Sequence, residues 1–350
     1  MLEIFTEQLA AAQVLTADQV HRAVEWLTDE KISAAVKAQF LAALAEKGET
    51  PAEITAFAQA LREKSIPLPL AAETRAREIL DIVGTGGDRL GTFNISTSAA
   101  ILCAAAGVTV AKHGNRAATS QAGSADVLEA LGIPIDLTPA AAARSLREKN
   151  FAFLFAPNFH PAFKNILPAR KLCAARGQRT IFNLLGPLLN PARPSAMLVG
   201  VPRPEFCEPL AQVLQTLGVR RAMVVCGKIG GRKPADGNLL DELSTLGENT
   251  IAEFYQERGF TVSTTWPEQF PLQSAALADL VGGDKFANAE IVRRILRGDE
   301  RGPKRDAVLL NAGAALFVAG RSRSLAEGWE LAAATIDSGQ ANARLLSLAS

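Results

Sequence analysis

The pattern of apolar and polar positions along the chain changes near residue 70. The residues before that point contain helix starts and no strand-like apolar run: Thr16–Gln19 and Thr50–Glu53 both fit the capping box, and Gly48 lies where a helix should end. From about Ile79 onward, short apolar runs alternate with helical stretches. The pattern therefore predicts an all-helical N-terminal region, a proline-containing linker, and then a different architecture.

Five apolar runs are the predicted strands: "ILDIVG" (79–84), "GVTVAK" (107–112), "FAFLFAP" (151–157), "SAMLVGV" (195–201) and "RAMVVCG" (221–227). Strands that alternate with helices are typical of a parallel sheet covered by helices. We predict an α/β fold with a small all-helical domain over 1–70 and a large α/β domain, with a mostly parallel central sheet, over 71–350. The segment 160–190 reads as helices and turns, and we expect it to pack against the N-terminal helices. Near the C-terminus, a capping box at Ser324–Glu327 predicts the start of a last helix.

Composition and charge remove several classes of function. The net charge of +1 gives no overall field that would attract nucleic acid or a membrane surface, so we expect neither as a partner. The chain has no apolar stretch of about 20 residues and no basic leader at its N-terminus. Its four cysteines are far apart, which favours buried thiols in a reducing cytoplasm over a zinc site or disulfides. We therefore expect a cytoplasmic protein.

A glycine cluster lies between the first predicted strand and the next helix, in "IVGTGGDRLGTFNIST" (82–97). Glycines at 84, 86 and 87 let backbone N–H groups approach an anion, and Ser96 and Thr97 add hydroxyls at the start of the helix. The cluster fits neither the dinucleotide fingerprint nor the P-loop. A phosphate site is the functional interpretation, and an ordinary turn into a capped helix is the alternative.

A second strand, loop and helix follow in "AKHGNRAATSQAGSADVLEALG" (111–132). Lys112 and Arg116 bring positive charge, Asn115 brings a donor group, and Ser124 with Asp126 predicts a helix start. Two neighbouring anion-binding loops imply a ligand with more than one phosphate. The alternative is a solvated loop whose basic residues pair with surface acids.

Three acidic residues are candidates for metal or hydroxyl binding. Asp241 and Glu242 are adjacent, and a carboxylate pair near a polyphosphate site typically binds Mg²⁺, although a pair in a loop can also be plain solvated surface. Asp88 lies inside the phosphate loop, where it needs a cation or a ligand hydroxyl.

A fourth group of residues fits an aromatic carboxylate. His160, Arg170 and Pro187 occur among apolar residues, so a guanidinium and apolar walls are available together. On spacing alone, Arg170 could equally be an arginine on a helix surface.

Several of these stretches resemble, in chain order, the motifs of the anthranilate phosphoribosyltransferase family: "GTGGD", "TFNIST", "KHGNR", "GSADVLEALG", "HPAFK", "RTIFNLLGPLLNPA", "LDELS" and "LLNAGAALFVAG". The resemblance covers nearly the whole chain. It implies a Mg²⁺-dependent transfer of phosphoribose from 5-phosphoribosyl 1-pyrophosphate (PRPP) to the amine of anthranilate, a step of tryptophan biosynthesis, with no general base required. It also implies a homodimer held through the helical domain.

The same resemblance assigns site residues. PRPP would bind at Gly84, Gly86, Gly87, Asp88, Thr92, Asn94, Ser96, Thr97, Lys112, Asn115 and Ser124. Anthranilate would bind at Gly84, Asn115, His160, Arg170 and Pro187. Magnesium would bind at Ser96, Asp241 and Glu242.

The chain departs from the family pattern in the loop "CGKIGGRKPADGNLLDELS" (226–244), which is longer and more basic than is usual. Two other functions use a similar fold. A pyrimidine nucleoside phosphorylase would share the "KH-x-NR" loop but is disfavoured by "RTIFNLLGPLLNP" and by the acidic pair. A non-catalytic nucleic-acid-binding relative should lose that pair and gain a basic groove.

Overall fold

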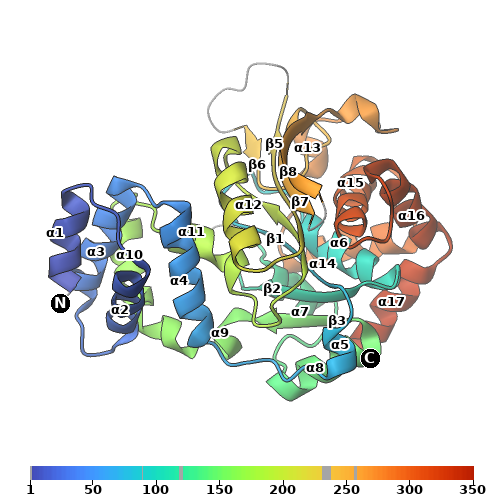
Figure 1. Ribbon diagram of the computed structural model, residues 1–350. Coiled ribbons are helices and arrows are strands. Elements are labelled where there is room, and N and C mark those ends of the chain that lie inside the picture. The colour runs from blue at the N-terminus through green and yellow to red at the C-terminus, as the bar shows by residue number, and fades with distance from the viewer. Residues whose placement is uncertain (1, 89, 118–120, 231–237, 256–257) are drawn as a thin grey trace.

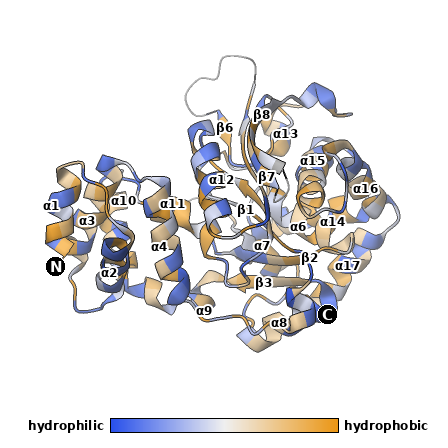
Figure 2. Cartoon of the chain, in the orientation of Figure 1, coloured by the Kyte–Doolittle hydropathy of each residue, from blue (hydrophilic) through white to orange (hydrophobic). Residues whose placement is uncertain are grey.

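The computed structural model describes residues 2–88, 90–117, 121–230, 238–255 and 258–350. Its N-terminal part is a bundle of helices, at the left of Figure 1: α1 (Leu2–Ala10), α2 (Ala17–Thr28), α3 (Ala34–Lys47) and α4 (Pro51–Glu63). Both predicted capping boxes are confirmed, at Thr16 and Thr50, and Gly48 ends α3 with φ at 86°. In Figure 2 these helices carry both hydrophilic and hydrophobic stretches, as helices with one buried face do.

A later segment lies against this bundle. It contains α9 (Ala156–Phe159), η1 (Pro161–Asn165), α10 (Leu167–Ala175), α11 (Phe182–Leu185) and η2 (Gly186–Leu189), where η marks a 3₁₀ helix. The α10 helix packs on α3. The buried Lys37 of α3 donates to the carbonyl oxygens of Asp29 and Asn165, at 2.7 and 2.8 Å, and so ties η1 to the bundle. Residues more than a hundred positions apart therefore share one helical layer.

The larger part of the molecule is built on one sheet with the strand order β3-β2-β1-β4-β5-β7-β8, in which β6 also pairs with β5. The first five strands are β1 (Ile79–Gly84), β2 (Thr109–Gly114), β3 (Phe151–Phe155), β4 (Ala196–Gly200) and β5 (Arg221–Lys228). All five were predicted, and they are parallel to one another. The fold is thus α/β with a small helical domain and a mostly parallel sheet.

The sequence pattern did not predict three antiparallel strands: β6 (Leu239–Leu240), β7 (Asn249–Tyr255) and β8 (Arg258–Thr265). The β6 strand has only two residues, and β8 lies at the edge of the sheet with residues 261–264 exposed. An edge strand needs few apolar side chains, so it lacks the continuous apolar run of the central strands.

Helices cover both faces of the sheet. One face packs against α6 (Ile95–Ala105), α7 (Ser124–Ala130), α14 (Lys285–Arg297), α15 (Pro303–Val318), α16 (Leu325–Asp337) and α17 (Gln340–Ala349). The other face packs against α12 (Cys207–Thr216) and, in the same apolar cluster, the N-terminal bundle. The remaining short elements are α5 (Ala72–Arg75), α8 (Pro139–Lys149), α13 (Leu277–Leu280), η3 (Pro204–Phe206) and η4 (Pro267–Gln269). Among the described residues, no helix is long and apolar enough to cross a membrane.

The C-terminal helices correct two predictions: α17 follows α16, which was predicted to be the last helix, and the start of α16 differs in detail. Ser324 accepts a hydrogen bond from the backbone N–H of Glu327, as expected. The Glu327 carboxylate, however, accepts from the backbone and guanidinium of Arg323 rather than from the N–H of Ser324. Only half of the capping box forms, because a neighbouring guanidinium is the stronger partner for a carboxylate.

Candidate active site

The predicted phosphate loops lie at the carboxyl ends of β1 and β2, where parallel α/β sheets usually bind ligands. The first loop connects β1 to α6, and the second connects β2 to α7. Gly86 and Gly91 of the first loop have φ values of 74° and 69°, which only glycine adopts without strain. The loop that precedes the acidic pair contains residues 231–237, which lie outside the described residues.

The acidic pair contacts the backbone of the first phosphate loop. Asp241 Oδ2 accepts hydrogen bonds from the backbone N–H groups of Gly86, at 2.5 Å, and Gly87, at 3.3 Å. Glu242 Oε1 accepts from the N–H of Ser96, in the first turn of α6, at 3.2 Å. Residues about 150 positions apart thus meet, in spite of the unusual loop that leads to the pair.

Glycines at the ends of three strands make this meeting possible. A Cβ on Gly84, at the end of β1, would lie 2.8 Å from Asp241 Oδ2, and a Cβ on Gly200, at the end of β4, would lie 1.4 Å from the carbonyl oxygen of Asp241. A Cβ on Gly227, near the end of β5, would lie 2.5 Å from the Cβ of Ser244. The sequence motifs did not indicate that Gly200 or Gly227 would help to place the acidic pair. The signal that could have indicated their role is a glycine at or near the end of each of these three apolar runs.

Burial and mutual repulsion raise the pKa values of both acids. The pKa of Asp241 rises to about 7, first because of burial and then because of the charge of Asp88. The pKa of Glu242 rises to about 8, first because of burial and then because of Asp241, although Lys112 opposes the rise. A group of buried carboxylates that repel one another is a favourable environment for a cation. Asp88 itself accepts a hydrogen bond from the N–H of Leu90.

Lys112 is buried at the carboxyl end of β2 and points toward the first loop. Its Nζ donates to the carbonyl oxygen of Ile82, at 2.6 Å, and lies 3.4 Å from Ser96 Oγ. Burial lowers the pKa of Lys112, while the nearby charges of Asp81 and Glu242 oppose that effect. Lys112, predicted as a cation of the phosphate site, therefore lies next to the acidic pair.

Two buried residues that the sequence analysis missed support this arrangement. Asp81 of β1 accepts from Asn190 Nδ2, at 2.8 Å, and from the backbone N–H of His113, at 3.3 Å. The same Nδ2 donates to the carbonyl oxygen of Ala111, at 2.7 Å. Asn190 ends the "NLLGPLLN" stretch, and it joins that stretch to both β1 and β2. Burial raises the pKa of Asp81 to about 6, against the opposing charge of Lys112.

The second phosphate loop is closed at its base by Asp126. Its Oδ2 accepts from the N–H groups of Ala117, at 3.0 Å, and Gly123, at 2.9 Å, so the two ends of the loop are drawn together. A Cβ on Gly123 would lie 2.4 Å from the nitrogen of Ala117, which requires glycine there. Asn115 lies on one side of this closure and Ser124, the first residue of α7, lies on the other.

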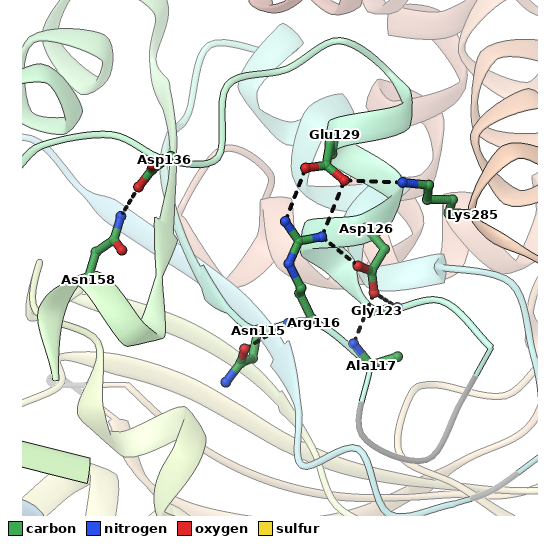
Figure 3. A network of polar contacts seen from close by, with 9 residues as sticks. All are labelled: Asn115, Arg116, Ala117, Gly123, Asp126, Glu129, Asp136, Asn158 and Lys285. Atoms are coloured by element: carbon green, nitrogen blue, oxygen red, sulfur yellow. Dashed lines mark hydrogen bonds and ion pairs between the residues drawn. The ribbon is translucent and has the colours of Figure 1, made fainter. Parts of the chain in front are cut away.

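Arg116 does not supply charge to the site as the sequence analysis had expected. Figure 3 shows its guanidinium between Asp126 and Glu129, at 2.9 and 3.0 Å, with Lys285 of α14 also bound to Glu129. The hydrogen bonds that this guanidinium donates to Glu129 and Asp126 raise the pKa of Arg116. Arg116 is therefore part of an exposed ion-pair network, the alternative considered for this loop.

Three further residues that were predicted to bind PRPP lie at the start of α6 or just before it. Thr92 pairs with Val281 in an isolated β-bridge. Asn94 is the N-cap residue of α6, and its amide contacts Ala122 and Asn288. The Thr97 hydroxyl is buried, and among the described residues it has no hydrogen-bond partner.

Two of the residues predicted to bind anthranilate, His160 and Arg170, lie along a row of rings. The ring centroids of His113 and His160 are 5.2 Å apart, those of His160 and Phe163 are 5.2 Å apart, and those of Phe163 and Phe182 are 5.7 Å apart. The guanidinium of Arg170 lies 5.3 Å from the ring centre of Phe182. The row thus runs from β2 to a half-buried cation on α10. Burial lowers the pKa of His113 to about 3 and that of His160 to about 4, so both rings are neutral near pH 7.

Pro187, the last predicted acceptor residue, is buried in η2. The next residue, Leu188, accepts a hydrogen bond at 2.6 Å through its carbonyl oxygen from Nε of Arg62 on α4. Burial lowers the pKa of Arg62 to about 10, and the charge of Arg193 adds to this effect. The helical bundle therefore contacts the segment 160–190 in two places, at η2 through Arg62 and at η1 through Lys37.

The fold and this site define a two-domain glycosyl transferase. Residues 4–65 match the glycosyl transferase family helical bundle domain, and residues 76–342 match the glycosyl transferase family a/b domain. The anthranilate phosphoribosyltransferase of Lacticaseibacillus paracasei is 46% identical over 97% of this chain and 94% of its own length. That of Petrotoga mobilis is 43% identical over 99% and 95%.

Solved structures of related enzymes support the same family. The anthranilate phosphoribosyltransferase of Thermus thermophilus has a TM-score of 0.87 and 42% identity, with 98% of each chain covered. The Saccharomyces cerevisiae enzyme, in complex with PRPP and Mg, has a TM-score of 0.85 and 26% identity, with 99% of this chain and 96% of that chain covered. The chain belongs to the anthranilate phosphoribosyltransferase family.

Proposed function

We propose that this enzyme transfers the 5-phosphoribosyl group of PRPP to the amino group of anthranilate, giving N-(5-phosphoribosyl)anthranilate and pyrophosphate in tryptophan biosynthesis. The observation that carries the proposal is the contact of Asp241 and Glu242 with the backbone of the Gly84–Thr97 loop. This contact joins a carboxylate pair of the kind that binds magnesium to a loop of the kind that binds phosphate. The relatives described above support the choice of substrates.

The donor is proposed to bind between the two phosphate loops. The N–H groups and hydroxyls around Gly84–Thr97 offer donors to the phosphates, and Lys112 offers a buried positive charge beside them. Asn115 and Ser124, at the two ends of the second loop, are proposed to complete the site. The full proposed PRPP set is Gly84, Gly86, Gly87, Asp88, Thr92, Asn94, Ser96, Thr97, Lys112, Asn115 and Ser124.

Mg²⁺ is proposed to bind at Ser96, Asp241 and Glu242, where it would neutralise charge on the leaving pyrophosphate. Among the described residues, no three acidic, histidine or cysteine side chains form a complete metal cage. Magnesium commonly uses one or two carboxylates together with substrate phosphates and water, so this donor set fits it. The raised pKa values of both acids fit a cation as well.

The acceptor is proposed to bind along the ring row, with its carboxylate near Arg170 and with contacts to Gly84, Asn115, His160 and Pro187. An aromatic amine is neutral at pH 7, so it needs no strong base to attack the ribosyl carbon. The enzyme's work is then to align the two substrates and to stabilise charge on the leaving group. The neutral imidazoles of His113 and His160 leave Arg170 as the cation of the row, which suits a ligand with one carboxylate.

A fluorescence assay tests the proposal. Anthranilate is fluorescent, and its signal should fall when the enzyme is mixed with PRPP and Mg²⁺. The signal should stay constant when PRPP is left out. A constant signal with both substrates and high enzyme concentration would contradict the proposed reaction.

Two further properties are proposed. The enzyme is a homodimer that associates through its helical domain, which exposes apolar side chains at Ile4, Val14, Leu167 and Leu172. It is cytoplasmic, in keeping with four buried free cysteines. Light scattering on a size-exclusion column should give twice the monomer mass of 37.0 kDa. A monomer at micromolar concentration would contradict the dimer.

A further inference from the structure

We propose that Asn288, on α14, is a positioning residue for the donor site, because it fixes which end of the Asn94 amide faces the bound phosphates. The inference rests on the proposed function, since it takes Asn94 as a PRPP contact. Asn288 is buried, and it is separated from Asn94 by 194 positions in the chain. No sequence motif considered above included it.

The segment that leads to Asn288 is attached to the first phosphate loop through its backbone. The N–H of Phe93 donates to the carbonyl of Leu280 at 3.0 Å, and the N–H of Gly282 donates to the carbonyl of Gly91 at 2.9 Å. A Cβ on Gly282 would lie 2.8 Å from the Cα of Phe93 and 2.4 Å from Oδ1 of Asn288. The close approach therefore depends on glycine, and it brings the Asn288 amide up to the loop.

The hydrogen bonds leave each amide only one orientation. The backbone N–H of Gly283 can only donate, and it contacts Asn288 Oδ1 at 2.8 Å, so the NH₂ of Asn288 is the group that faces Asn94, at 2.9 Å. Oδ1 of Asn94 must accept this bond. Its NH₂ then points to the carbonyl oxygen of Ala122, at 3.3 Å, which can only accept. The orientation deduced from the Gly283 N–H and the orientation deduced from the Ala122 carbonyl therefore agree.

This orientation matters for an anionic ligand. The Asn94 NH₂ group has two hydrogens, and the Ala122 carbonyl takes one, so the other can bind a ligand oxygen. If the amide were rotated, its oxygen would face the phosphates and the Ala122 carbonyl, and both contacts would be repulsive. Asn94 also links the first phosphate loop to Ala122, at the end of the second. Asn288 therefore fixes the orientation of an amide group that links the two loops.

Neither amide is needed to cap its own helix. Asp284 caps α14 by accepting from the N–H groups of Phe286 and Ala287. The side chain of Asn94, at the N-cap of α6, caps no N–H of that helix. The contact between Asn94 and Asn288 is thus additional to what the two helices require.

The test compares Asn288→Asp with Asn288→Ala. Aspartate has nearly the same shape, but as a carboxylate it can only accept, so it favours the rotated Asn94 amide. Alanine removes the constraint and leaves Asn94 able to rotate. We expect Asn288→Asp to raise the KM for PRPP roughly 10-fold to 100-fold, and to raise it more than Asn288→Ala does, while the KM for anthranilate changes little. A packing role would give the reverse order, because truncation leaves a cavity and the isosteric change does not.

A double-mutant cycle completes the test. In an Asn94→Ala background, Asn288→Asp should have little further effect on the KM for PRPP, because the group it orients is gone. Asn158→Asp is the matched control, since it places the same new carboxylate against Asp136, on a residue of α9 that belongs to neither phosphate loop. Equal effects in both backgrounds, or a milder effect of Asp than of Ala, would overturn the inference. If Asn288→Asp does not fold, the Asn288→Ala effect in the two backgrounds decides. Absence of turnover in the unchanged enzyme would instead count against the proposed function.

Discussion

The proposed donor and acceptor sides of the site are built in different ways. On the donor side, carboxylates from one loop accept hydrogen bonds from backbone N–H groups of another, and Lys112 is buried among them. On the acceptor side, a row of rings ends at Arg170, and the segment that carries it is held from the helical bundle by Lys37 and Arg62. Charged side chains of both signs thus lie together on the proposed donor side, whereas Lys37 and Arg62 on the other side are used to hold chain segments together through backbone carbonyls.

This difference suggests a division of labour. The proposed donor would bring several negative charges, and dipoles and ionisable groups are concentrated on its side, at the edge of the sheet. The proposed acceptor is one flat ring, for which shape and apolar surface would matter more than charge. A substitution on one side should therefore affect one substrate and leave the other nearly unchanged.

The largest effect is expected from the acidic pair. The double substitution Asp241→Asn with Glu242→Gln should lower kcat roughly 10³-fold or more, because the proposed metal site loses both charges. The free energy of unfolding without Mg²⁺ should stay the same or increase, since the amides relieve the repulsion that raises both pKa values. Steady-state kinetics at varied Mg²⁺ and thermal unfolding measure the two effects. Normal Mg²⁺-dependent turnover would show that the metal lies elsewhere.

A smaller effect is expected at Arg170. Arg170→Ala should raise the KM for anthranilate roughly 10-fold to 100-fold, because the ligand carboxylate loses a charged partner. The KM for PRPP should change little. Arg176→Ala is the control, since Arg176 lies exposed just after α10. An effect confined to PRPP would refute the assigned role of Arg170.

The smallest effect is expected from acid on the buried histidines. The pKa of His160 in the folded state is about 4, below the ordinary value near 6.5 in the unfolded chain, so the unfolded state takes up its proton first as the pH falls. Its contribution to the free energy of unfolding is present above about pH 6.5, and about 1 kcal/mol is lost between about pH 6.5 and about pH 5.5. Urea unfolding of His160→Gln should lack this part of the acid dependence. The exposed His21→Gln should retain it, and identical profiles for His160→Gln and the parent would contradict the assignment.

Much of the architecture could be predicted from the sequence. Helix caps such as Thr50 are local, because all the interacting groups lie within four residues. The central parallel strands are nearly continuous apolar runs, because both of their faces are buried. The edge strand β8 was missed for the opposite reason, since solvent removes the need for apolar side chains at its exposed positions. The fold class thus followed from local pattern, and the antiparallel extension did not.

The geometry of the site was less accessible from sequence. "LDELS" predicted an acidic pair, but its contact with Gly86 and Gly87 depends on a glycine at the end of β4, Gly200, that only the packed sheet makes necessary. The Asn288 amide is another example, because nothing near it in sequence points to the phosphate loop. Such contacts join residues that the chain separates widely, and no local pattern records them.

Lys112 and Arg116 show most clearly where the two kinds of information separate. The run "AKHGNR" (111–116) predicts two cations near the end of β2, and the glycines at 84, 86 and 87 predict a tight turn before α6. Which of the two cations lies beside the acidic pair depends on the packing of other elements. The pleat of β2 and the surrounding strands bury Lys112 beside Ser96, whereas α7 and α14 draw Arg116 outward into a network with Asp126 and Glu129. A charged side chain binds whichever partners the fold brings near it, and here those partners come from other elements of the chain.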